Sequence, residues 1–270
     1  MSAALRSAGA RLFPVALVAA LAVALTFLAL PVVAIFVDVG PAALLDSLDD
    51  PESLDALRVS LEATAVALAI ILLVGTPVAW GLATRRFRGR QVLVTLVELP
   101  LVLPPAVAGI GLLAALGPKG LFGSALHSLG IELVFTLAGV IVALVFVASP
   151  FYVRQAQAAF AALDPTLLEA SRTLGASEAR TFVRVAIPVA FQSLLAGAAL
   201  AWGRALGEFG ATLIFAGSLQ RVTQTAPLAI YARFSTDFPG ALTLSAVLVA
   251  ISAAILLGTK LLTRFGEPPL

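Results

Sequence analysis

The sequence predicts an all-α integral membrane protein with about six membrane-spanning helices. Hydrophobic residues occupy 60% of its 270 positions, and the mean hydropathy is +1.06. Only 12% of the residues are charged, about half the usual share in a soluble domain. A soluble domain of this size could not bury so much apolar surface, so the lipid bilayer is the expected solvent.

Six apolar segments are long enough to cross a bilayer, which takes about 20 residues. The first follows Arg6 and Arg11. Its apolar run is too long for a signal peptide, and no small-residue cleavage site precedes Asp38, so we interpret it as a retained helix. The expected spans are 13–37, 58–83, 91–116, 133–153, 187–216 and 240–263.

The basic residues fix the expected orientation. Alternate loops carry only four of them, at Arg58, Lys119, Arg221 and Arg233, against twelve in the termini and the other loops. Because loops rich in Lys and Arg stay in the cytoplasm, both termini are expected there. The twelve are Arg6, Arg11, Arg85, Arg86, Arg88, Arg90, Arg154, Arg172, Arg180, Arg184, Lys260 and Arg264.

The first outer loop is acidic instead. Its carboxylates most simply form a solvated loop, and a docking surface for a partner is the alternative. They are Asp38, Asp46, Asp49, Asp50, Glu52 and Asp55.

Composition excludes several kinds of chemistry. The chain has no Cys and a single His, His127, which removes disulfides, thiolate metal sites and most general-base arrangements. No basic run is interleaved with aromatic residues, so no nucleic acid partner is expected. A membrane-embedded enzyme would need reactive groups that are missing here, such as paired carboxylates beside a His. A channel or secondary transporter is a further alternative.

The stretch EASRTLGASEARTFVRVAIP, residues 169–188, stands out because it is charged and amphipathic inside an apolar chain. Asp164 and Pro165 are typical of a helix start, although Thr166 and Glu169 have capping-box spacing that would start the helix two residues later. Gly175 is suited to end this short helix in a left-handed conformation, and a second helix is expected from Ser177. Pattern alone would also allow a hairpin lying on the lipid surface.

This stretch resembles the "EAA" loop of ABC importer permeases, E-A-A-x3-G-x9-I-x-L-P. The matching positions are Glu169, Ala170, Gly175 and Pro188, and three positions depart: Ser171 for Ala, Val185 for Ile and Ile187 for Leu. The resemblance implies that this loop couples the permease to a separate ATP-hydrolysing subunit through Glu169, Ala170, Ser171, Gly175, Ile187 and Pro188. It also implies the type I importer architecture, with Glu169 capping the helix or pairing with an Arg.

The chain has no G-x4-G-K-[ST] phosphate-binding loop. Its expected loops are too short for a nucleotide-binding or solute-binding domain. ATP and Mg²⁺ are therefore expected on a partner ATPase, and no cofactor is expected in this chain. The resemblance implies a homodimer of two permease copies, two ATPase subunits and one extracytoplasmic solute-binding protein, in the inner membrane of a prokaryote.

Further strings resemble the molybdate and tungstate permeases. They are residues 98–123, "ALDPTLLEASRTLGAS", "GRALGEFGATLIFAGS" and "TQTAPLAIYARF". Sulfate and thiosulfate permeases share much of this pattern, and they are the alternative. The resemblance implies ATP-driven import of an oxyanion, molybdate or tungstate in the first place.

Two features suggest where a translocation path would lie. Pro100, Pro104 and Pro105 interrupt the third span, so freed backbone carbonyls must be buried in protein or face water. Arg204 and Glu208 are four apart in the middle of the fifth expected span, where they would share one helix face. Such charges form either a structural salt bridge or part of a substrate path.

Small residues recur beside this pair, at Gly197-Ala198-Ala199 and from Gly203 to Gly207. They favour close helix packing, within the chain or between two copies. We divide the chain into an N-terminal helix with its acidic loop (1–57), a permease transmembrane domain (58–263) whose coupling loop spans 164–188, and a short tail (264–270).

Overall fold

The computed structural model describes residues 3–40 and 50–264, and the side chains of residues 13–40 and 50–261. All regular structure in these ranges is helical, which confirms the predicted fold class. The helices are α1 (Ala3–Asp38), α3 (Pro51–Thr84), α4 (Arg90–Val102), α5 (Pro105–Leu116), α6 (Gly123–Ser128), α7 (Leu137–Ala161), α8 (Pro165–Thr173), α9 (Glu178–Thr181), a π-helical turn η1 (Phe182–Ala186), α10 (Ile187–Leu206), α11 (Gly210–Ala216), α12 (Ala226–Arg233) and α13 (Phe238–Arg264).

Five helices in the described ranges are each long and apolar enough to cross a membrane. The third predicted span is broken: α4 and α5 form a pair bent by 119°. The fifth predicted span is broken too, because α10 ends at Leu206 and α11 starts at Gly210. The prediction of one continuous helix over 187–216 was therefore wrong. Gly207 and Gly210 flank the break, and glycine lowers the cost of leaving the helix.

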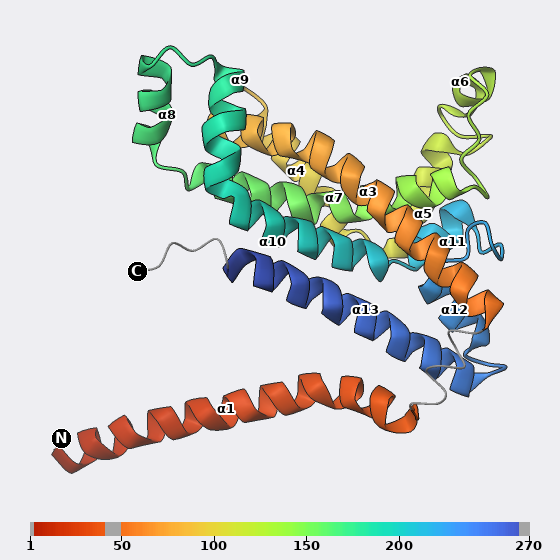
Figure 1. The fold of residues 1–270 in the computed structure, drawn as a ribbon, viewed down its shortest axis with the longest axis horizontal. Coiled ribbons are helices and arrows are strands. Elements are labelled where there is room, and N and C mark those ends of the chain that lie inside the picture. The colour runs from red at the N-terminus through yellow and green to blue at the C-terminus, as the bar shows by residue number, and fades with distance from the viewer. Residues whose placement is uncertain (1–2, 41–49, 265–270) are drawn as a thin grey trace.

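One end of the molecule carries α8 and α9, and the first turn of α1 and the last turn of α13 lie at the same end (Figure 1). We call it the hairpin end, and the opposite end, with α6 and α12, the far end. Arg154 lies within α7, which extends to Ala161, so placing it in a loop was wrong. The remaining basic residues still predict that the hairpin end faces the cytoplasm.

The core forms around α7, which packs mainly against α3 and α10. Its buried contacts are largely small or medium residues, including Ala63 and Ala67 of α3, Leu144 and Ala148 of α7, and Ala201 of α10. Small side chains let helix backbones approach closely, which drives helix association in lipid. Two smaller apolar clusters lie on this core, one joining α5 and α11 to α7 and one joining α3 to α12 and α13.

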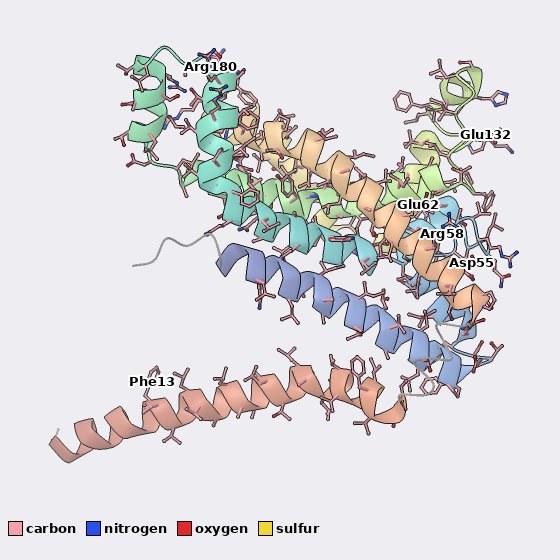
Figure 2. All side chains as sticks on the ribbon, in the orientation of Figure 1. Phe13, Asp55, Arg58, Glu62, Glu132 and Arg180 are labelled. Atoms are coloured by element: carbon pink, nitrogen blue, oxygen red, sulfur yellow. The ribbon has the colours of Figure 1, made fainter. Side chains whose placement is uncertain are left out.

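Helix α1 stands apart from the other helices and packs mainly against α13 (Figure 1). None of its side chains in the apolar segment Phe13–Asp38 is buried. Phe13, labelled in Figure 2, is 71% exposed. An apolar surface of this kind suits lipid or another membrane protein as its neighbour.

Candidate functional site

Residues 164–186 form a hairpin, called the coupling hairpin after its predicted role, and it starts as one of the two predicted alternatives requires. Asp164 is the N-cap of α8, and its carboxylate accepts a hydrogen bond from the Thr166 backbone N–H at 2.9 Å. Pro165 occupies the first helical position, where its missing N–H costs nothing. The same hydrogen bond lowers the pKa of Asp164. Helix α8 is therefore capped by Asp164 and not by Thr166, two residues later.

Gly175 turns the chain between the two helices, as predicted. Its φ is +80°. Its N–H bonds to the Arg172 carbonyl at 2.9 Å, and the Ala176 N–H bonds to the Ser171 carbonyl at 3.1 Å. This pair of bonds is a Schellman motif, which satisfies the last carbonyls of α8. Ser177 then caps α9 by accepting a hydrogen bond from the Arg180 N–H at 3.3 Å.

Three contacts fix the hairpin in place. The Ser171 and Thr181 hydroxyl oxygens lie 2.9 Å apart and join α8 to α9. Arg85 donates to both carboxylate oxygens of Glu178, at 3.0 and 3.1 Å. The serine that departs from the expected alanine thus supplies a bond inside the hairpin, which sequence reasoning did not foresee.

An aromatic cluster anchors the base of the hairpin to the membrane helices. Phe182 of η1 lies 5.4 Å from Trp80 of α3 and 6.0 Å from Phe160 of α7, measured between ring centroids. Trp80 and Phe160 meet edge to face at 5.3 Å. Rings at these separations and angles attract each other beyond their buried area.

The hairpin presents an apolar and basic surface to solvent. Leu174 at its tip is 88% exposed, and Leu167 is 45% exposed. Arg180 lies at the same end, where Figure 2 labels it. The hairpin therefore leaves apolar and basic side chains accessible at this end of the described chain.

The remaining predicted coupling residues occupy different places. Glu169 and Ala170 are exposed on α8. Glu169 does not cap the helix, since Asp164 does, and it forms no ion pair with any residue that the structure describes. Ile187 donates its N–H to the Phe182 carbonyl at the end of the π-turn, and Pro188 is exposed in the first turn of α10.

The predicted charged pair lies at the break between α10 and α11, not in the middle of a helix. An Arg204 Nη2 and a Glu208 Oε2 atom are 2.5 Å apart, and the Glu208 side chain is only 1% exposed. The other carboxylate oxygen of Glu208 accepts the Ala211 N–H at 2.7 Å. Glu208 therefore joins the end of α10 to the first turn of α11.

The glycines near this pair separate into two groups. A methyl group added at Gly197 would lie 3.0 Å from Gln155 and 3.3 Å from Tyr152, so this glycine serves packing within the chain. Gly203 and Gly207 are exposed, and added methyl groups there would meet no other helix within 4 Å. Arg204, between them, keeps 26% of its side chain exposed. Packing within the described chain therefore does not explain why small residues occupy the face of α10 that carries Gly203 and Gly207.

Pro104 and Pro105 lie where the third predicted span breaks, and both are exposed. Pro100, by contrast, lies inside α4 and does not end it. A methyl group added at Gly210 would lie 2.8 Å from the Pro105 Cβ. The breaks in the third and fifth predicted spans thus lie against each other, which the sequence did not reveal.

At the far end, three outer-loop carboxylates form ion pairs within the chain. Arg233 of α12 lies 2.6 Å from Asp50 and 3.0 Å from Glu52, and Arg221 lies 2.9 Å from Asp55. Partial burial opposes ionisation of Asp50, but hydrogen bonds from Arg233 and Ser53 outweigh it and lower its pKa to about 2. These three residues are therefore paired within the chain, and neither predicted alternative, a freely solvated loop or a free docking surface, describes them. Asp46 and Asp49 lie outside the described residues.

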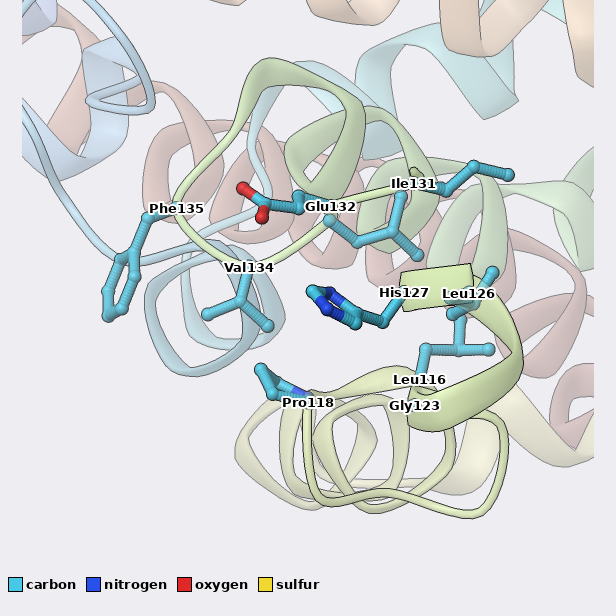
Figure 3. A pocket seen from close by; sticks show the side chains of 10 residues that line it. Leu116, Pro118, Gly123, Leu126, His127, Ile131, Glu132, Val134 and Phe135 are labelled. Atoms are coloured by element: carbon cyan, nitrogen blue, oxygen red, sulfur yellow. The ribbon is translucent and has the colours of Figure 1, made fainter. Parts of the chain in front are cut away.

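A cavity of about 260 Å³ lies in the far-end segment between α5 and α7 (Figure 3). Leu116, Pro118, Val134 and Phe135 line it, and the imidazole of His127 projects among them (Figure 3). His127 itself lies in α6 and is exposed. Within the described residues no group of three or more His, Cys, Asp or Glu side chains is arranged to hold a metal ion.

Comparison with known proteins identifies the family. Residues 71–268 match the family described as "Binding-protein-dependent transport system inner membrane component". The chain belongs to this family. It is 39% identical over 242 residues to the molybdenum transport system permease protein ModB of Mycobacterium bovis, covering 90% of this chain and 92% of that protein. It is 36% identical over 224 residues to the sulfate transport system permease protein CysT of Salmonella typhimurium, covering 82% and 81%.

Solved structures agree with this membership. The bacterial alginate ABC transporter, solved in complex with an alginate-bound periplasmic protein, contains a chain that matches with a TM-score of 0.75 at 16% identity, covering 96% of each chain. This chain is therefore a permease subunit of an ABC importer and not an enzyme, and it is a multi-pass protein of the prokaryotic inner membrane. Permeases of this family work with a binding protein and with ATPase subunits. The alternatives of a membrane-embedded enzyme, a channel or a secondary transporter are not supported.

Proposed function

We propose that this permease imports an oxyanion, molybdate or tungstate, along a path that passes Arg204. The observation that carries the proposal is a guanidinium that is 26% exposed at the end of an apolar helix. A charge in a membrane segment does not face lipid; it faces protein or water and often marks a substrate path. Since Gly203 and Gly207 leave this face of α10 open, an anion or a second copy of the chain has room to approach it.

Glu208 would weaken the binding of an oxyanion by Arg204 enough for the anion to be released. A bare guanidinium would hold an oxyanion tightly, whereas a site for transport must release what it binds. The short contact with Glu208 offsets part of the positive charge and fixes the side chain. Pro104 and Pro105 belong to the same region, because the break that they form lies against Gly210. The alternative is that the pair only fixes the packing of α10 and α11.

The proposed assembly has two copies of this chain, two ATPase subunits on the coupling hairpins and one solute-binding protein at the far end. ATP and Mg²⁺ would bind the ATPase subunits. The exposed leucines and arginines of the hairpin support an ATPase contact there. In that contact Glu169, Ala170 and Leu174 face the partner, whereas Ser171 and Gly175 hold the shape of the hairpin.

Relatives of both substrate classes match this chain at similar identity, so we keep molybdate as the first candidate and sulfate as the second. The ModB relative is a molybdenum permease at 39% identity, and the CysT relative is a sulfate permease at 36%. The two oxyanions share charge and tetrahedral shape, so one Arg contact does not separate them. Discrimination is expected in the solute-binding protein.

The test is uptake of radiolabelled molybdate by proteoliposomes that contain the permease, its ATPase and its binding protein. We expect uptake that needs ATP and the binding protein, that tungstate inhibits and that equal sulfate does not. Calorimetry of the binding protein with the three anions locates the discrimination. Equal inhibition by sulfate, with tight sulfate binding, would overturn molybdate in favour of the sulfate alternative.

A further inference from the structure

The segment that joins the coupling hairpin to α10 has an irregular spacing of buried residues. Ala186, Ala190 and Leu194 are buried at intervals of four, as in an ordinary amphipathic α-helix. Continued backwards as an α-helix, this pattern would place Phe182 and Val183 on the inner face. Instead Thr181 is buried at 1% exposure, and Val183 is 58% exposed. The buried residue that precedes Ala186 is thus Thr181, five positions earlier, whereas the spacing along α10 is four.

The π-turn η1 accounts for this step. The Ile187 N–H bonds to the Phe182 carbonyl, five residues earlier, so the turn contains one residue more than an α-helical turn. One residue corresponds to about 100° of rotation around an α-helix. Without the extra residue in the turn, the same sequence would present the hairpin to its surroundings rotated by about that angle.

The contacts of the hairpin depend on this orientation. Phe182 reaches Trp80 and Phe160 in the aromatic cluster, and Glu178 reaches Arg85 in the loop after α3. These partners belong to α3, α7 and the adjoining loop, so they do not turn with α10. A hairpin rotated in this way would turn Thr181 off the inner face, would separate Glu178 from Arg85, and would point Leu174 in another direction.

We propose that the π-turn sets the rotational position in which the coupling hairpin meets the ATPase subunit. The extra residue lets two faces fit at once: the small residues of α10 against α7, and the buried Thr181, whose hydroxyl contacts Ser171 of α8. The π-turn is a positioning element, and the surface that it positions is the exposed tip with Leu174. This inference rests on the proposed coupling to an ATPase.

A pair of deletions tests it. Deleting Val183 alone removes the one extra residue, so an α-helix forms and both Thr181 and Phe182 stay on the inner face. Deleting Val183 together with Arg184 removes one residue too many and turns the hairpin by about 100°. The double substitution Val183→Ala/Arg184→Ala is the matched control, because it changes the same side chains without changing the spacing.

Each variant of the full-length permease is assayed for hairpin orientation and for coupling, which together give three readouts. The first is cross-linking of Arg85→Cys to Glu178→Cys with a short bifunctional maleimide, which the absence of native cysteine makes specific. It reports the orientation without any partner. The second is co-purification of the ATPase, together with ATP-dependent molybdate uptake in proteoliposomes.

We expect the single deletion and the control to keep the cross-link, the bound ATPase and uptake. The double deletion should insert in the membrane and lose all three. If it does not insert, one Ala inserted after Val183 turns the hairpin in the opposite sense and should give the same losses. A single deletion that loses cross-link and ATPase, or a rotated variant that keeps both, overturns the inference. An unaltered permease that never binds the ATPase refutes the proposed function, and the cross-link still reports the orientation.

Discussion

At the scale of single residues, Glu208 is the charged side chain that is fully buried in the described part of the chain. Its carboxylate is buried, and it holds Arg204 with one oxygen and the Ala211 N–H with the other. A buried charge that loses its partner costs about 3–5 kcal/mol, whereas neutralising both partners costs much less. The two residues should therefore behave as a unit in stability.

Substitution of this pair separates stability from transport. We expect Arg204→Gln to be the least stable variant, because it leaves the carboxylate uncompensated. Glu208→Gln should lose less, since its amide oxygen still accepts from Ala211. The double glutamine variant should recover thermal stability in detergent and yet fail to transport molybdate. Transport at the level of the unaltered chain by the double variant would show that the pair is purely structural.

Asp50 is the second residue with a predictable effect. Its pKa is lowered to about 2 in the folded chain from an ordinary value of 3.8, so it stabilises the fold above about pH 4 and loses this effect as the pH falls toward 2. Its side chain is 35% exposed, so solvent screening reduces the contribution to about 1 kcal/mol.

We expect Asp50→Asn to lower the thermal midpoint at pH 7, because Arg233 loses one charged partner. The difference from the unaltered chain should shrink as the pH is lowered from 4 to 2. Thermal unfolding in detergent over this range measures it. An undiminished difference at the lowest pH would mean that the ion pair is not its cause.

At the scale of elements, the coupling hairpin depends on one backbone conformation. Gly175 has φ +80°, a region that costs an ordinary residue about 1–2 kcal/mol and a β-branched residue more. The Schellman bonds at this position define the angle between α8 and α9, so a change here alters the surface that the ATPase would meet.

We expect Gly175→Val to abolish uptake and ATPase co-purification while the protein still inserts in the membrane. Gly81→Ala is the matched control, because Gly81 is helical, lies near the same end, and has space for a methyl group. The control should transport normally. If Gly175→Val binds its ATPase and transports like the control, the hairpin is not the coupling element.

At the scale of the whole molecule, the arrangement of charges predicts the topology. With both termini in the cytoplasm, reporters fused after residues 45 and 125 should report the outer face, and those after residues 88 and 176 the cytoplasm. Alkaline phosphatase and green fluorescent protein fusions measure the two sides. A cytoplasmic signal at residue 125 would contradict the six-span arrangement.

The sequence by itself determined the class of the molecule and the caps of the short hairpin helices. Hydropathy predicted the spans, since burial in lipid depends on composition over about 20 residues. Asp164, Gly175 and Ser177 act on backbone groups a few residues away, so the hairpin followed from local rules. The prolines predicted an interruption of the third span, although not its 119° bend.

Only the tertiary structure decided how distant segments meet. The pairing of Asp50 and Glu52 with Arg233, and the approach of Pro105 to Gly210, join residues far apart in the chain. A periodic apolar pattern says which face of a helix is buried, but not which partner covers it. The π-turn arises for the same reason: α10 and the hairpin each fit different neighbours, and one extra residue reconciles the two.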